Sequence, residues 1–270
     1  MGKAARKAAP VIERGGQVQS LTRAIGILDA IAASHDGLTL TAVAQAVGLA
    51  PSTAHRLLTT LQQARFVRFE AVGGVWQVGV RAFTIGSAFL HTRDIALIAR
   101  PHLRALMEAS GETANLYVPE EGEAICIAQV ESRRMMRAIA RPGGRAKLHC
   151  SGAGKAMLAH LQAREVDRVL APHGLPAMTA RTLTSRRALH ADLAATRARG
   201  YAIDDEEHEI GLRCIAAAAL DEHGSPLAGI SISGPSARID DRRMEALGTL
   251  VAAAARAITE ASGGALPPAG

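Results

Sequence analysis

The sequence of 270 residues lacks several features that define whole classes of proteins. No apolar run approaches the roughly 20 residues of a membrane-spanning helix, and the basic N-terminus lacks the apolar segment of a secretory signal. The three cysteines, Cys126, Cys150 and Cys214, form no CxxC pair, which argues against a disulfide framework or a zinc ribbon. These absences favour a reducing cytoplasm and predict neither a bound metal nor a cofactor.

Complete catalytic motifs are also missing. SGAGKA at 151–156 ends like a phosphate loop, but such a loop needs Gly at 149 and Ser or Thr at 156, where this chain has His149 and Ala156. No GxSxG sequence occurs, and the sequence does not place a histidine as the catalytic partner of Cys150, although this cysteine precedes a predicted helix. An enzyme that uses Asp204, His208 and Cys214 stays open as a remote alternative.

The excess of positive over negative charge lies entirely in the N-terminal part of the chain. Residues 1–100 hold 11 Lys and Arg against 5 Asp and Glu, whereas residues 101–270 hold 20 of each. This asymmetry favours an N-terminal part that meets a polyanion, although a net charge of +6 is also ordinary for a soluble protein.

Three apolar repeats of helical period precede a predicted hairpin. Helices are expected at 20–34, with Ser20 as a possible N-cap, at 38–49, capped by Thr39 or Thr41, and at 51–66. The strand patterns FVRFE and VWQVG follow at 66–70 and 75–79. This order is typical of a winged helix-turn-helix, and the alternative is a three-helix domain with a merely solvated polar face. We expect the following side chains to contact DNA: Thr39, Ser52, Thr53, His55, Arg56, Thr59, Arg65 and Arg68.

VGLAPSTAHRLLTTL, at 47–61, resembles the recognition segment of the IclR family of bacterial transcription regulators. The resemblance continues in family order from about Ser20 to about Gly264, through blocks that include GETANLYV, LHCSGAGKAMLA and RGYAIDDEEHEIGLRCIAA. Two departures are Arg65, where the family usually has Gly, and Ala218, where it usually has Pro. The resemblance implies a regulator that is not an enzyme, that forms a dimer or a dimer of dimers and that binds operator DNA.

The predicted fold class is α+β, with a mainly antiparallel sheet in the second domain. The resemblance implies that this domain is a PAS/GAF-like effector domain. The expected organisation is a disordered basic tail at 1–17, a DNA-binding domain at 18–80, a linker helix at 81–98, an effector-binding domain at 99–264 and a second disordered tail at 265–270. Within the effector domain, MMRAIA at 135–140 has the pattern of a further strand.

Two segments of the second domain favour a ligand pocket. Gly152, Ala153 and Gly154 form a turn that opens a helix, where free backbone N–H groups can bind a small anion. CIAAAAL and PLAGISIS, joined by DEHGS, predict a hairpin that places Cys214 opposite Ser231–Ser233. The two serines share one strand face, which lines a cavity or, alternatively, meets solvent.

The acidic run DDEEHE at 204–209 has three alternative interpretations: a solvated strand edge, a metal site or a contribution to the pocket. The resemblance favours the last, because members that sense small 2-oxo acids have an acid, a cysteine, two serines and the helix-opening turn at the matching positions. It implies that Asp204 joins Cys214, Ser231, Ser233 and Gly152–Ala153–Gly154 around the effector, while the other acids stay in water. Residues 101–270 contain no Phe or Trp, so a small anion is expected, glyoxylate first and pyruvate second.

Overall fold

The computed structural model describes residues 18–34, 36–92, 95–138 and 140–265. The chain divides into two compact units, Met1–Phe89 and Leu90–Gly270. The tails expected at 1–17 and 265–270 lie outside the described residues, apart from Ala265. None of the helices in the described ranges has the length and apolarity that crossing a bilayer needs.

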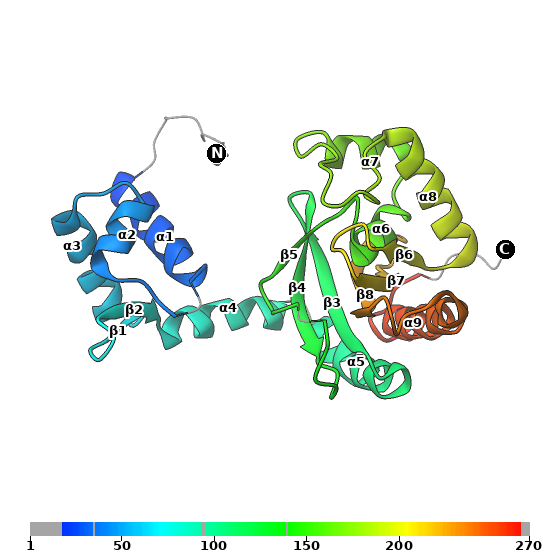
Figure 1. Ribbon diagram of the computed structural model, residues 1–270, viewed down its shortest axis with the longest axis horizontal. Helices are drawn as coiled ribbons and strands as arrows, with labels where there is room; N and C mark the ends of the chain where they lie inside the picture. The colour runs from blue at the N-terminus through cyan, green and yellow to red at the C-terminus, as the bar shows by residue number, and fades with distance from the viewer. Residues whose placement is uncertain (1–17, 35, 93–94, 139, 266–270) are drawn as a thin grey trace. The chain divides into compact units, whose positions relative to one another are not determined.

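The first unit is a winged helix-turn-helix (Figure 1). Its elements are α1 (Gln19–Ala32), α2 (Leu40–Ala46), α3 (Pro51–Gln63), β1 (Val67–Glu70), β2 (Val75–Val78) and most of α4 (Val80–Thr92). Buried side chains from every element before α4 form one core: Ile27, Ile31, Val43, Leu58, Val67 and Trp76. Because Leu38 also exchanges backbone hydrogen bonds with Trp76, the hairpin is tied to the segment before α2.

Most local signals in this unit act as expected. Thr39 caps α2 by accepting a hydrogen bond from the N–H of Ala42, at 3.3 Å. Gly48 ends α2 in the left-handed region, with φ of 65°, which glycine adopts without steric cost. The expectation that Ser20 caps α1 is wrong, since the helix begins one residue earlier and Val18 occupies the cap position without a side-chain bond.

The second unit is a six-stranded antiparallel sheet with helices on both faces (Figure 1). The strand order is β5-β4-β3-β8-β7-β6, and the strands are β3 (Thr113–Glu120), β4 (Glu123–Val130), β5 (Arg145–Lys147), β6 (Ala202–Asp205), β7 (Leu212–Leu220) and β8 (Pro226–Pro235). The longer helices α5 (Ile95–Ser110) and α9 (Asp241–Ala261) cover one face. The other face carries α6 (Gly152–Leu158), α7 (Ala163–Leu170) and α8 (Arg186–Arg199). This arrangement confirms the predicted α+β class.

Successive side chains of β8 point to opposite faces of the sheet. Ile230 and Ile232 are fully buried in the core beneath α5 and α9. Ser231 and Ser233 point to the opposite face and are also buried, at 2% and 6% exposure. The alternative that these serines face solvent is therefore wrong.

Some secondary-structure elements expected from local sequence patterns differ in the structure. The strand expected at 135–140 is absent from its described residues, where the backbone bends and Met135 is almost fully exposed. The acidic run is a strand only as far as Asp205, because Glu206 adopts a φ of 59° and turns the chain. The region expected as one linker helix, 81–98, contains most of α4 and the start of α5, while residues 93–94 lie outside the described ranges.

Candidate functional site

The outer face of α3 presents the side chains predicted to meet DNA. Ala54 and Leu58 face the core, so Ser52, His55 and Arg56 are exposed on the opposite side of the helix, and Thr53 is half-buried. The guanidinium of Arg56 has no hydrogen-bond or ion-pair partner in the described part of the chain. Arg56 therefore lies exposed in the N-terminal half of α3, and a free guanidinium there can donate two hydrogen bonds to the edge of a guanine.

Two of the predicted hydroxyls already have local partners. Thr59 donates its hydroxyl to the carbonyl of His55, at 2.9 Å, and Thr39 caps α2. A phosphate oxygen needs a donor, so the Thr59 hydroxyl must leave the His55 carbonyl before it can bind one.

The hairpin β1–β2 brings two further arginines to the surface. Arg65 and Arg68 are exposed, and Arg68 lies opposite Gln77 in the ladder. Arg65 has a φ of 61°, a conformation that is costly for a residue with a Cβ. The same geometry explains why glycine is common at this position in the family that the sequence resembles.

In the second unit, a cavity of about 320 Å³ lies between α6 and the strands β6, β7 and β8. It brings together most of the residues predicted to bind an effector, and these lining residues are Gly152, Ala153, Asp204, Cys214, Ser231 and Ser233. Gly154, the remaining predicted residue, is not part of the lining. Its N–H donates to the hydroxyl of Ser151, and a Cβ there would lie 2.4 Å from Leu148, so glycine serves close packing.

The first turn of α6 offers free backbone donors. The N–H groups of Gly152 and Ala153 have no acceptor among the described residues, and both residues line the cavity. A Cβ on Gly152 would approach the Cβ of Cys214 to 3.1 Å, so glycine lets α6 sit directly on β7. The two N–H groups therefore face a cavity with the partial positive charge of a helix start.

Asp204 is a buried carboxylate at the end of β6. Its Oδ1 accepts hydrogen bonds from the N–H groups of Glu207, at 2.8 Å, and His208, at 3.2 Å. Burial nevertheless outweighs these bonds and raises the pKa of Asp204 to about 7. The side chain is therefore poised to be either a proton donor or a charged acceptor near neutral pH.

The two serines are oriented by an amide that the sequence reasoning missed. The side-chain N–H₂ of Asn115 donates to Ser231 Oγ, at 3.3 Å, and to Ser233 Oγ, at 3.2 Å, while Gln129 donates to Asn115 Oδ1. The Cys214 thiol also donates to Ser233 Oγ, at 3.0 Å. Because both serine oxygens accept and neither hydroxyl has an acceptor in the described part of the chain, their O–H groups remain available to a ligand. The sequence feature that could have indicated Asn115 is the alternation of β3, because Thr113, Asn115 and Tyr117 share one face of that strand.

Arg141 and Tyr117 also line the cavity and were not predicted. Arg141 is exposed, and its guanidinium has no partner among the described residues, so it adds positive charge at the cavity. Burial raises the pKa of Tyr117, so its hydroxyl stays protonated. Arg141 stands in RPGGR, whose sequence gives no sign that it reaches this cavity.

A buried ion cluster lies behind the cavity. Lys155 of α6 is fully buried and pairs with Glu207 and, at 3.1 Å, with Asp192 of α8. Glu207 is 6% exposed, so the expectation that the acids after Asp204 stay in water is wrong for this residue. The backbone N–H of Glu207 also donates a hydrogen bond to the carboxylate of Asp204. The ion pair between Lys155 and Glu207 therefore stabilises the turn that orients Asp204 in the cavity.

The thiols lack the properties of nucleophiles. Burial, with Asp204 and Glu207 nearby, raises the pKa of Cys150 to about 12, and its sulfur lies 3.9 Å from Nδ1 of His208. Burial also raises the pKa of Cys214, so neither cysteine is a thiolate at neutral pH. Among the described residues, no group of three or more His, Cys, Asp and Glu is arranged to hold a metal ion.

Comparison with protein families gives two matches. Residues 20–71 match the IclR helix-turn-helix domain, and residues 87–260 match the family described as bacterial transcriptional regulator IclR C-terminal.

The chain is also similar over nearly its whole length to characterised regulators. It is 51% identical to the transcriptional repressor IclR of Escherichia coli K12, with 92% of each chain covered. It is 50% identical to the acetate operon repressor of Salmonella typhimurium, covering 97% of this chain and 95% of that protein. The crystal structure of the Thermotoga maritima IclR shares 29% identity with a TM-score of 0.78, and the match covers 92% of this chain and all of that one.

Proposed function

The chain belongs to the IclR family of bacterial transcriptional regulators, and from this membership we propose that it is a repressor whose affinity for operator DNA is controlled by a small 2-oxo acid. The relatives from Escherichia coli and Salmonella typhimurium are both named as repressors, which supports repression over activation. Family membership places the chain among regulators rather than enzymes. A DNA-binding role also fits the predicted cytoplasmic location.

DNA recognition is assigned to α3 and the hairpin. Arg56 would read base edges in the major groove, with Ser52, Thr53 and His55 beside it, while Thr39, Thr59, Arg65 and Arg68 would contact phosphates. Self-association to a dimer or tetramer would place two recognition helices on successive half-sites.

The effector assignment rests on one observation: four hydrogen-bond donors that have no acceptor among the described residues lie around the same cavity. The N–H groups of Gly152 and Ala153 and the hydroxyls of Ser231 and Ser233 all belong to one cavity. A carboxylate with an adjacent carbonyl supplies the matching acceptors, and Asp204 would bind the carbonyl oxygen or a hydroxyl of its hydrate. Cys214 would pack against this group, since burial keeps its thiol protonated and disfavours addition to the carbonyl.

Glyoxylate is the preferred ligand, and pyruvate is the alternative. The cavity of about 320 Å³ admits either molecule, so volume does not separate them. One relative is named as the acetate operon repressor, and glyoxylate has two carbons as acetate does, which supports glyoxylate over pyruvate.

Calorimetry with glyoxylate, pyruvate and acetate tests the effector assignment. Glyoxylate should bind most tightly, and acetate, which lacks the carbonyl, should bind weakest. Acetate binding as tightly as glyoxylate would show that the pocket does not recognise a 2-oxo acid.

A gel shift with the DNA upstream of the protein's own gene tests the DNA assignment. Arg56→Ala should weaken specific binding by about 1–3 kcal/mol and relax sequence preference, because one bidentate base contact is lost. A folded Arg56→Ala variant with unchanged affinity would remove α3 from base recognition.

A further inference from the structure

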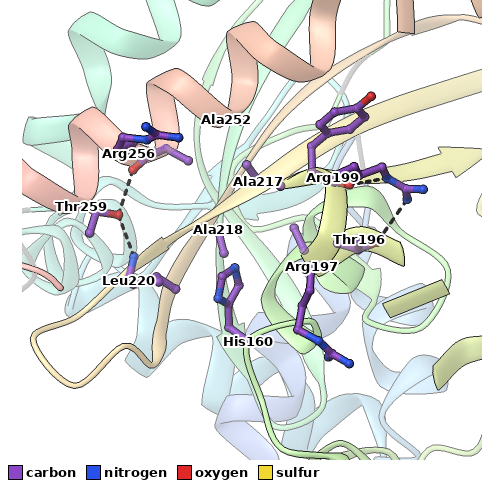
Figure 2. A pocket seen from close by; sticks show the side chains of 14 residues that line it. His160, Thr196, Arg197, Arg199, Ala217, Ala218, Leu220, Ala252, Arg256 and Thr259 are labelled. Atoms are coloured by element: carbon purple, nitrogen blue, oxygen red, sulfur yellow. Dashed lines mark hydrogen bonds between the residues drawn. The ribbon is translucent and has the colours of Figure 1, made fainter. Parts of the chain in front are cut away.

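A second cavity of about 320 Å³ lies where the edge of the sheet is open (Figure 2). Strand β6 pairs with β7 only as far as Ala216, so the following residues of β7 have no strand beside them on that side among the described residues. The cavity is closed instead by α6, the end of α8 and α9. It shares no lining residue with the pocket that contains Asp204.

The floor of this cavity is apolar. Its apolar side chains come from α6, β7 and α9, and they are Ala156, Ala217, Ala218, Leu220, Ala252 and Ala255. The polar groups of Thr196 and Thr259 nearby are already bonded, since Thr259 accepts from the N–H of Leu220 and Thr196 accepts from Arg199. A ligand body that lies on this floor therefore has to be apolar and compact.

The rim is cationic, and no Asp or Glu is among the lining residues. Figure 2 shows Arg256 on one side, Arg197 and Arg199 on the other, and His160 between them. The guanidinium of Arg199 donates hydrogen bonds to the carbonyl of Tyr201 and to the hydroxyl of Thr196, and it lies 3.7 Å from the carboxylate of Asp192. Arg197 uses one nitrogen for the carbonyl of Ala159.

The side chains of Arg256 and His160 make no hydrogen bond in the part of the chain that the structure describes. The neighbouring acid Glu260 lines the adjoining surface of α9 with Arg256 but makes no ion pair with it there. Burial and the nearby Arg197 lower the pKa of His160, so its neutral ring offers one N–H donor while Arg256 supplies the positive charge. A charged donor and a neutral donor above an apolar surface fit a ligand with one anionic end.

We propose that this cavity binds a monocarboxylate with a compact apolar body, held by Arg256 and His160 at its charged end. The ligand would be larger and more apolar than the 2-oxo acid assigned to the first pocket, and the two would not compete. Helix α6 carries residues of both cavities, since Gly152 and Ala153 face the first and Ala156 faces the second. A ligand in the second cavity therefore touches the helix that supplies the backbone donors of the first.

The test is calorimetry on the full chain with cyclohexanecarboxylate and its neutral amide as probes. The carboxylate should bind, and the amide should bind about tenfold more weakly, because it cannot form the charge-assisted bond. Arg256→Gln should weaken carboxylate binding by about tenfold, and Ala252→Leu, which fills the floor, should weaken both probes.

Two matched controls give the opposite expectation. Arg242 is an exposed arginine on α9 that lines neither cavity, so Arg242→Gln should leave the affinity unchanged. Ser231→Ala/Ser233→Ala, which alters only the first pocket, should also leave it unchanged, whatever becomes of glyoxylate binding. No carboxylate binding at millimolar concentration, equal affinity for the amide, or loss of binding in the serine variant with retention in Arg256→Gln would each overturn the proposal.

Discussion

At the scale of single residues, Asp204 shows how burial and hydrogen bonding set the chemistry of the pocket. Two backbone N–H groups favour its charged form, while burial and the nearby Glu207 favour the neutral form. Burial dominates and holds the pKa near 7. A ligand carboxylate entering the same cavity adds a further reason for Asp204 to be protonated.

Effector affinity should therefore depend on pH through Asp204. The protonated form does not repel an anion, so glyoxylate should bind about tenfold more tightly at pH 6 than at pH 8. Asp204→Asn keeps an oxygen for the two N–H groups but cannot ionise, so its affinity should be nearly flat over this range. Burial lowers the pKa of His208, which favours the neutral form of this lining residue. Calorimetry at several pH values measures the slope, and an equally steep slope in Asp204→Asn would assign the titration to another group.

At the scale of elements, the hairpin β1–β2 should supply affinity for DNA rather than sequence preference. Arg65 and Arg68 are exposed and unpaired among the described residues, and they flank the strand that leads away from α3. Removing both charges in Arg65→Gln/Arg68→Gln should weaken specific and nonspecific binding alike and lower the salt slope by about two, at roughly 0.9 per lost phosphate contact. Anisotropy titrations at several salt concentrations measure this. A changed operator preference with an unchanged slope would contradict phosphate contact.

The buried cluster that joins α6 to α8 should matter for stability. Lys155→Met leaves Glu207 and Asp192 without their shared cation, which should destabilise the protein by about 3–5 kcal/mol. Lys155→Met/Glu207→Leu removes one of the stranded charges and should recover part of the loss. Urea unfolding measures both variants. A single variant as stable as the wild type would show that the ion cluster does not hold these elements together.

Sequence patterns predicted these elements best where a local rule decides the structure. The β7–β8 hairpin follows from its two apolar runs, and its register places Cys214 opposite Ser233, as expected. The turn at Glu206 and the burial of Glu207 were missed because their cause is Lys155, which lies far away in the sequence. Asn115 was missed for the same reason, since its partners are on β8 and β4. Alternation on β3 indicates the strand face on which Asn115 lies, but it does not indicate which distant strands supply the partners of its side chain.

At the scale of the whole molecule, the account requires that a ligand in the second unit changes the DNA affinity of the first. A coupling free energy of about 1–3 kcal/mol is typical of such regulators. Helices α4 and α5 come between the hairpin β1–β2 and strand β3 in the sequence, so a change at the pocket would have to reach the recognition helices of a dimer along them.

The most direct measurement is the release of operator DNA by glyoxylate, followed by fluorescence anisotropy. In the wild type, glyoxylate should lower operator affinity by about tenfold, in line with the expected coupling. Ser231→Ala/Ser233→Ala removes the hydroxyl donors, so it should bind the operator normally and fail to release it. Ser225→Ala, an exposed serine outside both cavities, should respond like the wild type. Normal release by the double variant would contradict the account, because the effector would then bind without the donors that define the pocket.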